Sequence, residues 1–168
     1  MNIIFLGMPM SGKTTIGRIV AEKLQFKFYD SDELIAEEQN VSIGAVIEKN
    51  GEKYFRTQEK RLIKNYLSID SHVISIGGGA ANKTTKEIIK KYTHRVWLRC
   101  SIEELVGRYK PNQMDRPLLY NTTNIEEELK NYDIFPDVYG RAKSYASIYG
   151  KMLTRNKSFN EIFFFIGS

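Results

Sequence analysis

The sequence predicts a three-layer α/β/α fold around a mostly parallel, five-stranded sheet. Short apolar runs alternate with longer stretches whose apolar residues recur at helical spacing, a pattern typical of parallel strands covered by helices on both faces. A glycine-rich loop joins the first apolar run to the first helical stretch. The chain has 168 residues, of which 42% are hydrophobic and 27% charged, and this is enough for one core. We therefore expect residues 1–168 to form a single domain.

The elements are expected in the following order. Apolar runs bounded by glycine or polar residues predict strands at residues 2–6, 26–29, 72–76 and 95–99, with a further edge strand at 151–154. Helical spacing or a capping residue predicts helices at residues 14–24, 31–38, about 51–67, 101–109, from 125 towards 149, and near 158–165. Residues 110–124 are polar and rich in asparagine and threonine, and a loop of this length is typically functional or disordered.

Composition excludes several classes of protein. The net charge of +5 suits anionic ligands, but the basic residues are scattered and no RNA-binding aromatic signature accompanies them, so no nucleic-acid partner is expected. The single cysteine, Cys100, excludes an internal disulfide. Neither a signal peptide nor an apolar stretch of membrane-spanning length is visible. We expect a cytoplasmic protein that makes no membrane contact, and a monomer, although the sequence does not fix the oligomeric state.

The strongest motif is the loop from Gly7 to Thr14, which matches the Walker A pattern and lies between a predicted strand and a predicted helix. In this pattern, backbone N–H groups and the helix dipole bind phosphate oxygens. Lys13 is expected to neutralise the β and γ oxygens, and the Thr14 hydroxyl to ligate magnesium. The predicted ATP-binding residues of the loop are Met10, Ser11, Gly12, Lys13, Thr14 and Thr15.

A Walker A loop indicates nucleotide binding but leaves the reaction open. A GTPase needs an Asn-Lys-x-Asp box, and the two Asn-Lys pairs, at residues 82–83 and 156–157, lack the aspartate. A motor-type ATPase needs a strand that ends in acidic residues, whereas the strand at 72–76 ends in glycine. The interpretation that fits best is an ATP-dependent kinase of a small molecule.

Two carboxylates follow the second predicted strand, in the triplet Asp30-Ser31-Asp32. Residues two apart on an extended segment point the same way, so Asp30 can serve a magnesium ion through water while Asp32 accepts a hydrogen bond, and possibly a proton, from an acceptor hydroxyl. The alternative is that Ser31 or Asp32 only caps the following helix.

Five motifs, taken in order, resemble the shikimate kinase family. They are the Walker A loop, Asp30-Ser31-Asp32, Gly51-Glu52-x-x-Phe55-Arg56-x-x-Glu59, Gly77-Gly78-Gly79 and Arg116-Pro117-Leu118-Leu119. The resemblance spans nearly the whole chain and implies a P-loop fold like that of nucleoside monophosphate kinases. It also implies transfer of the γ-phosphoryl group of ATP to the 3-hydroxyl of shikimate, with one Mg²⁺ per subunit, in the shikimate pathway of aromatic amino acid biosynthesis.

On the acceptor side, the resemblance implies a shikimate-binding helical segment at residues 31–68. Asp32 resembles the aspartate that contacts the shikimate hydroxyls, and Arg56 the arginine that holds the carboxylate, a charge-assisted pair worth about 1.5–3 kcal/mol. Taken alone, Arg56 could instead pair with Glu52 on a solvated helix face; Glu59 is expected to orient it. The implied substrate-binding residues are Asp32, Arg56, Gly77, Gly78, Gly79 and Arg141.

On the nucleotide side, the resemblance implies a mobile lid at residues 110–124. Arg116 matches the lid arginine that closes over the ATP phosphates, which makes Lys13, Asp32 and Arg116 the implied catalytic residues. Arg141 is assigned from the match of Arg141-Ala-Lys-Ser-Tyr145 to an Arg-x-x-x-Tyr motif. Arg155 is expected near the adenine.

The chain departs from the family pattern at two places. Met10 stands where many members carry glycine, and Ser75-Ile76 precedes the triple glycine where a threonine is common. Two alternative functions stay open: another small-molecule kinase of this fold, such as a gluconate kinase, and a nucleotide-binding regulator without catalytic activity.

Overall fold

The computed structural model describes residues 1–78, 85–91, 94–98, 100–110, 122, 124–131 and 143–144. Its first half contains β1 (Asn2–Gly7), α1 (Lys13–Leu24), β2 (Lys27–Asp30), α2 (Ser31–Gln39), α3 (Ile43–Asn50) and α4 (Glu52–Leu67). The elements described after these are β3 (His72–Ser75), α5 (Lys86–Ile89), β4 (Arg95–Leu98), α6 (Ile102–Arg108), α7 (Ile125–Asn131) and β5 (Lys143–Ser144). Within these residues, no helix has both the length and the apolar character to cross a membrane.

The sheet has the strand order β2-β3-β1-β4-β5, and every described pair is parallel. β1 lies at the centre, with Phe5 beside Ser75 of β3 and Gly7 beside Leu98 of β4. This confirms the predicted parallel sheet. The described sheet has five strands, of which the edge strand β5 has only two residues. The edge strand expected at 151–154 lies outside the described residues.

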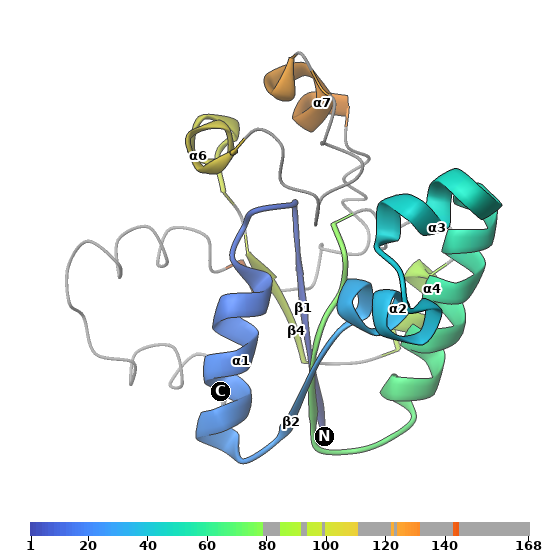
Figure 1. Ribbon diagram of the computed structural model, residues 1–168. Coiled ribbons are helices and arrows are strands. Elements are labelled where there is room, and N and C mark those ends of the chain that lie inside the picture. Colours follow the sequence, from blue (N-terminus) through green and yellow to red (C-terminus); the bar gives the residue numbers. More distant parts are fainter. Residues whose placement is uncertain are drawn as a thin grey trace.

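Helices cover both faces of the sheet and so form three layers (Figure 1). On one face, Ile3 and Phe5 of β1 pack with Ile16 and Val20 of α1. On the other face, the alternate residues of β1 pack with α4 and α5 through a cluster that comprises Ile4, Leu6, Ile63, Leu67, Ile74, Ile76 and Ile89. Because both of its faces are covered, every residue of β1 is buried.

A separate helical group extends from one face of the sheet. α2, α3 and α4 share their own buried cluster, formed by Ile35, Val46, Phe55 and Leu62. Figure 1 shows these three helices beside one another, while α6 and α7 lie beyond the carboxyl ends of β1 and β4. The group corresponds to the expected helical segment at 31–68, and it is well placed to form one side of a site at that edge of the sheet.

Two expected elements differ from the structure. α3 is not among the expected helices, although Ser42 caps it by accepting a hydrogen bond from the Ala45 N–H at 3.3 Å. A helix running from residue 125 towards 149 is wrong, because α7 ends at Asn131 and residues 143–144 pair with Val96 and Trp97 of β4. Pro136 gives a physical reason, since proline inside a helix removes a hydrogen bond and clashes with the preceding turn. The last expected helix, at 158–165, lies outside the described residues.

Candidate active site

The candidate site lies where β1, β2 and β3 end. Gly7 ends β1 and begins the phosphate loop, Asp30 ends β2, and Gly77 follows β3 by two residues. Because these strands are parallel and adjacent, their carboxyl ends meet at one edge of the sheet, which is where ligands bind in folds of this kind.

The phosphate loop leads directly into α1. Gly12 is the residue before the helix and has a φ of 92°, in the left-handed region that favours glycine. Lys13 begins the helix, and its side chain is only 8% exposed. Its Nζ donates hydrogen bonds to the carbonyl oxygens of Gly7 at 2.9 Å and Met8 at 2.8 Å. The loop thereby holds the ammonium group against its own backbone, at the place where phosphate oxygens bind in a Walker A loop.

Met10 occupies a backbone position that suits glycine. Its φ is 64°, and the left-handed region costs a residue with a side chain roughly 1–2 kcal/mol. The side chain is 8% exposed and packs with Met8, Leu105 and Leu129, and such burial can offset a cost of that size. The burial of the side chain therefore offsets the cost of the left-handed backbone at this position.

Asp30 connects the start of α1 to the start of α2. Its Oδ2 accepts a hydrogen bond from the Thr14 hydroxyl at 2.7 Å, and its Oδ1 accepts one from the Asp32 N–H at 3.0 Å. Asp30 is thus the capping residue of α2. The alternative that Ser31 or Asp32 caps this helix is wrong, because the cap residue precedes both of them. The carboxylate is 7% exposed.

Asp32 faces the glycine turn that follows β3. A Cβ atom on Gly77 would lie 2.4 Å from Oδ1 of Asp32, so this position accommodates the carboxylate only because it is glycine. Ser31 secures the turn from the same helix, since its Oγ accepts a hydrogen bond from the Gly77 N–H at 2.9 Å. A Cβ on Gly78 would lie 2.5 Å from the ring of Pro9 in the phosphate loop. The glycines therefore allow close contact within the protein.

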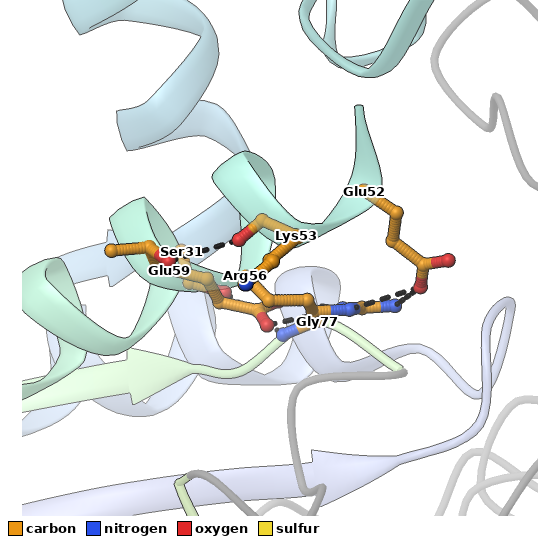
Figure 2. A network of polar contacts seen from close by, with 7 residues as sticks. Ser31, Glu52, Lys53, Arg56, Glu59 and Gly77 are labelled. Atoms are coloured by element: carbon orange, nitrogen blue, oxygen red, sulfur yellow. Dashed lines mark hydrogen bonds and ion pairs between the residues drawn. The ribbon is translucent and has the colours of Figure 1, made fainter. Parts of the chain in front are cut away.

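Arg56 on α4 lies between two carboxylates (Figure 2). Its Nη1 donates to both oxygens of Glu59, at 3.0 and 3.2 Å, and its Nε and Nη2 donate to Oε1 of Glu52, at 3.3 and 3.1 Å. The two partners differ in burial, because the side chain of Glu59 is 1% exposed and that of Glu52 is 60% exposed. The pair with Glu52 forms as the alternative expectation proposed, but the contact with buried Glu59 confirms that this carboxylate orients Arg56.

Burial and charge shift the pKa values of this network. Burial and, to a smaller extent, the nearby charge of Asp32 raise the pKa of Glu59 to about 7, against the opposing effect of Arg56. Burial alone would lower the pKa of Arg56, but the two carboxylates outweigh it and raise this pKa. Asp32, Arg56 and Glu59 thus interact electrostatically, and perturbed pKa values of this kind cluster at functional sites.

The structure brings together many, but not all, of the residues predicted for the site. Lys13, Thr14, Asp30, Asp32, Gly77 and Gly78 lie at one edge of the sheet, and Glu59 couples Arg56 electrostatically to Asp32. Thr15 is exposed in the first turn of α1, and Ser11 is buried in the loop. Four predicted residues lie outside the described part of the chain: Gly79, Arg116, Arg141 and Arg155.

Two residues of the site were not among the predictions. The sequence indicates Ser31 only as a helix cap and indicates no role for Pro9, yet both contact the glycine turn. The sequence signal for Ser31 was its position between two aspartates at a strand end. No local pattern could reveal Pro9, because its partner Gly78 is distant in the sequence.

Fold and site together define a P-loop phosphotransferase with a separate site for its acceptor. Comparison with known proteins identifies which one. The family model for shikimate kinase matches residues 9–163. A shikimate kinase from Sulfurihydrogenibium sp. is 42% identical over 119 residues, which cover 70% of this chain and 71% of the relative. The structure of a shikimate kinase from Acinetobacter baumannii, in complex with shikimate, is similar with a TM-score of 0.77 and 33% identity, covering 85% of this chain and 80% of that one.

The chain therefore belongs to the shikimate kinase family. As a member of it, the protein is an ATP-dependent kinase that phosphorylates an alcohol group of shikimate. A gluconokinase from Sinorhizobium meliloti is also similar, with a TM-score of 0.52, but its 13% sequence identity shows a common fold and nothing more. The comparisons thus favour shikimate over the alternative of a gluconate kinase.

Proposed function

We propose that the protein transfers the γ-phosphoryl group of ATP to the 3-hydroxyl of shikimate, with the phosphate loop as donor site and α2–α4 as acceptor site. The observation that carries the proposal is the contact between the two halves, because Asp32 lies against Gly77 while Gly78 lies against Pro9 of the phosphate loop. Phosphoryl transfer depends mainly on positioning and charge stabilisation, and these contacts bring an acceptor group close to the nucleotide.

Arg56 is the proposed partner of the shikimate carboxylate. Its bonds to Glu59 keep the guanidinium in place, since Glu59 is buried. Glu52 is largely exposed, so a ligand carboxylate can replace it on the other edge of the guanidinium at little cost. A planar guanidinium binds a carboxylate through two parallel hydrogen bonds. On this proposal, Glu52 occupies the binding edge of Arg56 until the substrate arrives.

Asp32 is the proposed partner of the acceptor hydroxyl. Its carboxylate is held near the glycine turn and is half-buried. A carboxylate there can accept a hydrogen bond from the hydroxyl and so direct its oxygen towards the γ-phosphorus. Loose, dissociative transfer asks little of a base, and Asp32 therefore acts mainly through orientation of the hydroxyl and can accept the released proton.

The residues around Thr14 and Asp30 suit a magnesium ion. Magnesium usually keeps several waters and uses one or two protein oxygens together with substrate phosphates, so it does not need the cluster of three ligating side chains that is absent among the described residues. The Thr14 hydroxyl and the Asp30 carboxylate lie 2.7 Å apart. Beside Asp30 on β3, the buried Oγ of Ser75 has no described hydrogen-bond partner, and a water bound to the ion would supply one. The ion would neutralise charge on the β and γ phosphates.

The rest of the proposal concerns residues outside the described part of the chain. On it, residues 110–124 form a mobile lid that carries Arg116 to the phosphates, Arg141 and Gly79 contact shikimate, and Arg155 lies near the adenine. A single-domain monomer in the cytoplasm completes the assignment.

Release of ADP with shikimate as acceptor tests the proposal directly. The purified protein is incubated with ATP, magnesium and shikimate, and ADP is measured by a coupled assay in parallel with gluconate and with no acceptor. We expect release to depend on shikimate and to stop when magnesium is chelated. The position of the phosphate is read by phosphorus–proton NMR, where coupling at carbon 3 is expected. ADP release that shikimate does not stimulate would contradict the function, and a phosphate at another carbon would contradict the proposed acceptor.

A further inference from the structure

The phosphate loop makes an unusual contact through Met10. Four described non-glycine residues have a positive φ: Met10, Gln25, Asn40 and Ser71. Gln25 and Asn40 end α1 and α2, where a left-handed residue is common, and Ser71 lies in the turn directly before β3. Met10 ends no helix, so its left-handed conformation needs another cause. Its side chain provides one, because it is buried with Leu105 of α6 and Leu129 of α7.

The main chain of the same residue is held from the same side. Nη1 of Arg108, in the last turn of α6, donates a hydrogen bond to the Met10 carbonyl oxygen at 3.1 Å. It also lies 3.3 Å from Sγ of Cys100, which precedes α6. α6 and α7 lie beyond the carboxyl ends of the strands, at the level of the loop (Figure 1). Both the side chain and the carbonyl group of Met10 are therefore fixed by elements outside the loop.

We propose that Met10 is a positioning residue for the nucleotide, which anchors the phosphate loop to α6 and α7. The loop binds phosphate through backbone N–H groups, whose directions depend on the loop conformation. A loop that samples several conformations must be ordered when ATP binds, and this weakens the apparent affinity. With its side chain buried in the α6–α7 cluster, Met10 keeps the loop in one conformation before ATP arrives.

Among the described contacts, those that hold Met10 involve neither Asp32 nor Arg56. Asp32 and Arg56 are held by α2, α4 and the turn after β3. Loss of the anchor should therefore change nucleotide affinity selectively, which a general loss of stability would not do. The inference requires that the protein binds ATP but is independent of which acceptor it phosphorylates.

Replacement of Met10 tests the anchor. We expect Met10→Ala to raise the KM for ATP, and the dissociation constant for ADP measured by calorimetry, by roughly 3–10-fold. The KM for shikimate should stay within about twofold. Met10→Leu retains apolar volume and should restore values close to those of the unaltered protein. Should Met10→Ala prove too unstable, Met10→Gly adopts the same φ without strain, and the same selective rise is expected.

A matched control separates anchoring from stability. Ile89→Ala removes a fully buried side chain from the cluster between β1 and α4, which does not include Met10, so it should lower the melting temperature without changing the affinity for ADP. Unchanged ADP affinity in Met10→Ala, or an equal rise in the KM of both substrates, would overturn the inference. Because the ADP measurement needs no turnover, its result does not depend on the identity of the acceptor.

Discussion

The two halves of the candidate site are built from different kinds of groups. In the phosphate loop, two side chains pack into the protein, because Met8 and Met10 are buried against α6 and α7, and a Walker A loop binds phosphate largely through backbone N–H groups. The acceptor half presents charged side chains, namely Asp32 and Arg56, each held by further charged or polar groups. Binding by backbone tolerates substitution at most positions, whereas binding by charge depends on single residues and their neighbours. One of these neighbours in the acceptor half is Glu59, a buried carboxylate whose pKa is raised to about 7.

The largest effect is expected at Lys13, the exception in a loop that otherwise binds through its backbone. Lys13→Ala removes the ammonium group that neutralises transferring phosphate, and loss of one such group typically lowers kcat by about 10²–10³-fold. Steady-state ADP release with shikimate measures it. Lys23→Ala, which replaces an exposed lysine in the last turn of the same helix, serves as control. If Lys13→Ala retained near-normal kcat, backbone groups of the phosphate loop alone would be enough to stabilise the transferring phosphate, and the role assigned to Lys13 would be wrong.

The next largest effect is expected at Arg56, where a substitution should raise the KM for shikimate but not the KM for ATP. Arg56→Ala removes a charge-assisted pair worth about 1.5–3 kcal/mol, so the KM for shikimate should rise roughly 10–150-fold. The KM for ATP should change little. Arg61→Ala is the matched control, because Arg61 lies on the same helix and pairs with exposed Glu38.

Truncation of Arg56 also leaves Glu59 buried without its partner, which is costly to stability. The double variant Arg56→Ala with Glu59→Gln removes that charge, and we expect it to recover stability but not shikimate affinity. A parallel rise of both KM values in the double variant would mean that Arg56 is misassigned.

A smaller effect is expected at the glycine turn. Gly77→Ala places a Cβ 2.4 Å from Oδ1 of Asp32, and the carboxylate has to rotate away. A misplacement of this size should lower kcat by about 10-fold, against a limit near 10²-fold for a 1 Å shift. Gly107→Ala in α6, where a Cβ meets nothing within 4 Å, should instead raise the free energy of unfolding by up to about 1 kcal/mol. Unaltered kcat in Gly77→Ala would show that the position of Asp32 is not critical.

The smallest effect concerns pH and Glu59. Its pKa in the folded state is about 7 and its ordinary value is 4.5, so the folded protein binds this proton more tightly than the unfolded chain. The stabilisation linked to Glu59 is therefore complete below about pH 4.5 and declines as the pH rises through 7. Glu59→Gln should lack this decline, which cannot exceed about 1.4 kcal/mol per pH unit for one proton.

Thermal unfolding between pH 5 and 8 measures the difference. The melting temperature of Glu59→Gln should improve, relative to the unaltered protein, as the pH rises. Glu52→Gln replaces the exposed partner of Arg56 and should follow the unaltered protein. A constant difference between Glu59→Gln and the unaltered protein across this range would place the titration of Glu59 outside it.

Local patterns in the sequence predicted the sheet and the nucleotide half well. β1, the phosphate loop and α1 follow one another in the sequence, so a single motif predicts their arrangement. α3 is also predictable from local signals in the sequence. Ser42 is a capping residue, and Ile43, Val46 and Ile47 recur at helical spacing. β5 had no such signal, since a two-residue strand depends on the free edge of β4.

The connections of the acceptor half were harder to predict because its residues are distant in the sequence. Asp30 and Arg56 were found through their motifs, but the contact of Ser31 with Gly77 and that of Pro9 with Gly78 depend on the packing of separate elements. The left-handed φ of Met10 could not be predicted from the sequence either, because methionine has no preference for this conformation. The dual role of Asp30, as a helix cap and a partner of Thr14, also required coordinates.

The contact of Gly78 with Pro9 has a consequence for the distance over which the phosphoryl group must travel. A Cβ at residue 78 would meet the backbone nitrogen of Pro9 at 2.8 Å as well as its ring, so it could be accommodated only by a shift of main chain. In-line transfer needs the reacting atoms about 3–3.5 Å apart. The absence of a side chain at Gly78 thus lets the turn after β3 and the phosphate loop lie closer together than any other residue at this position would allow.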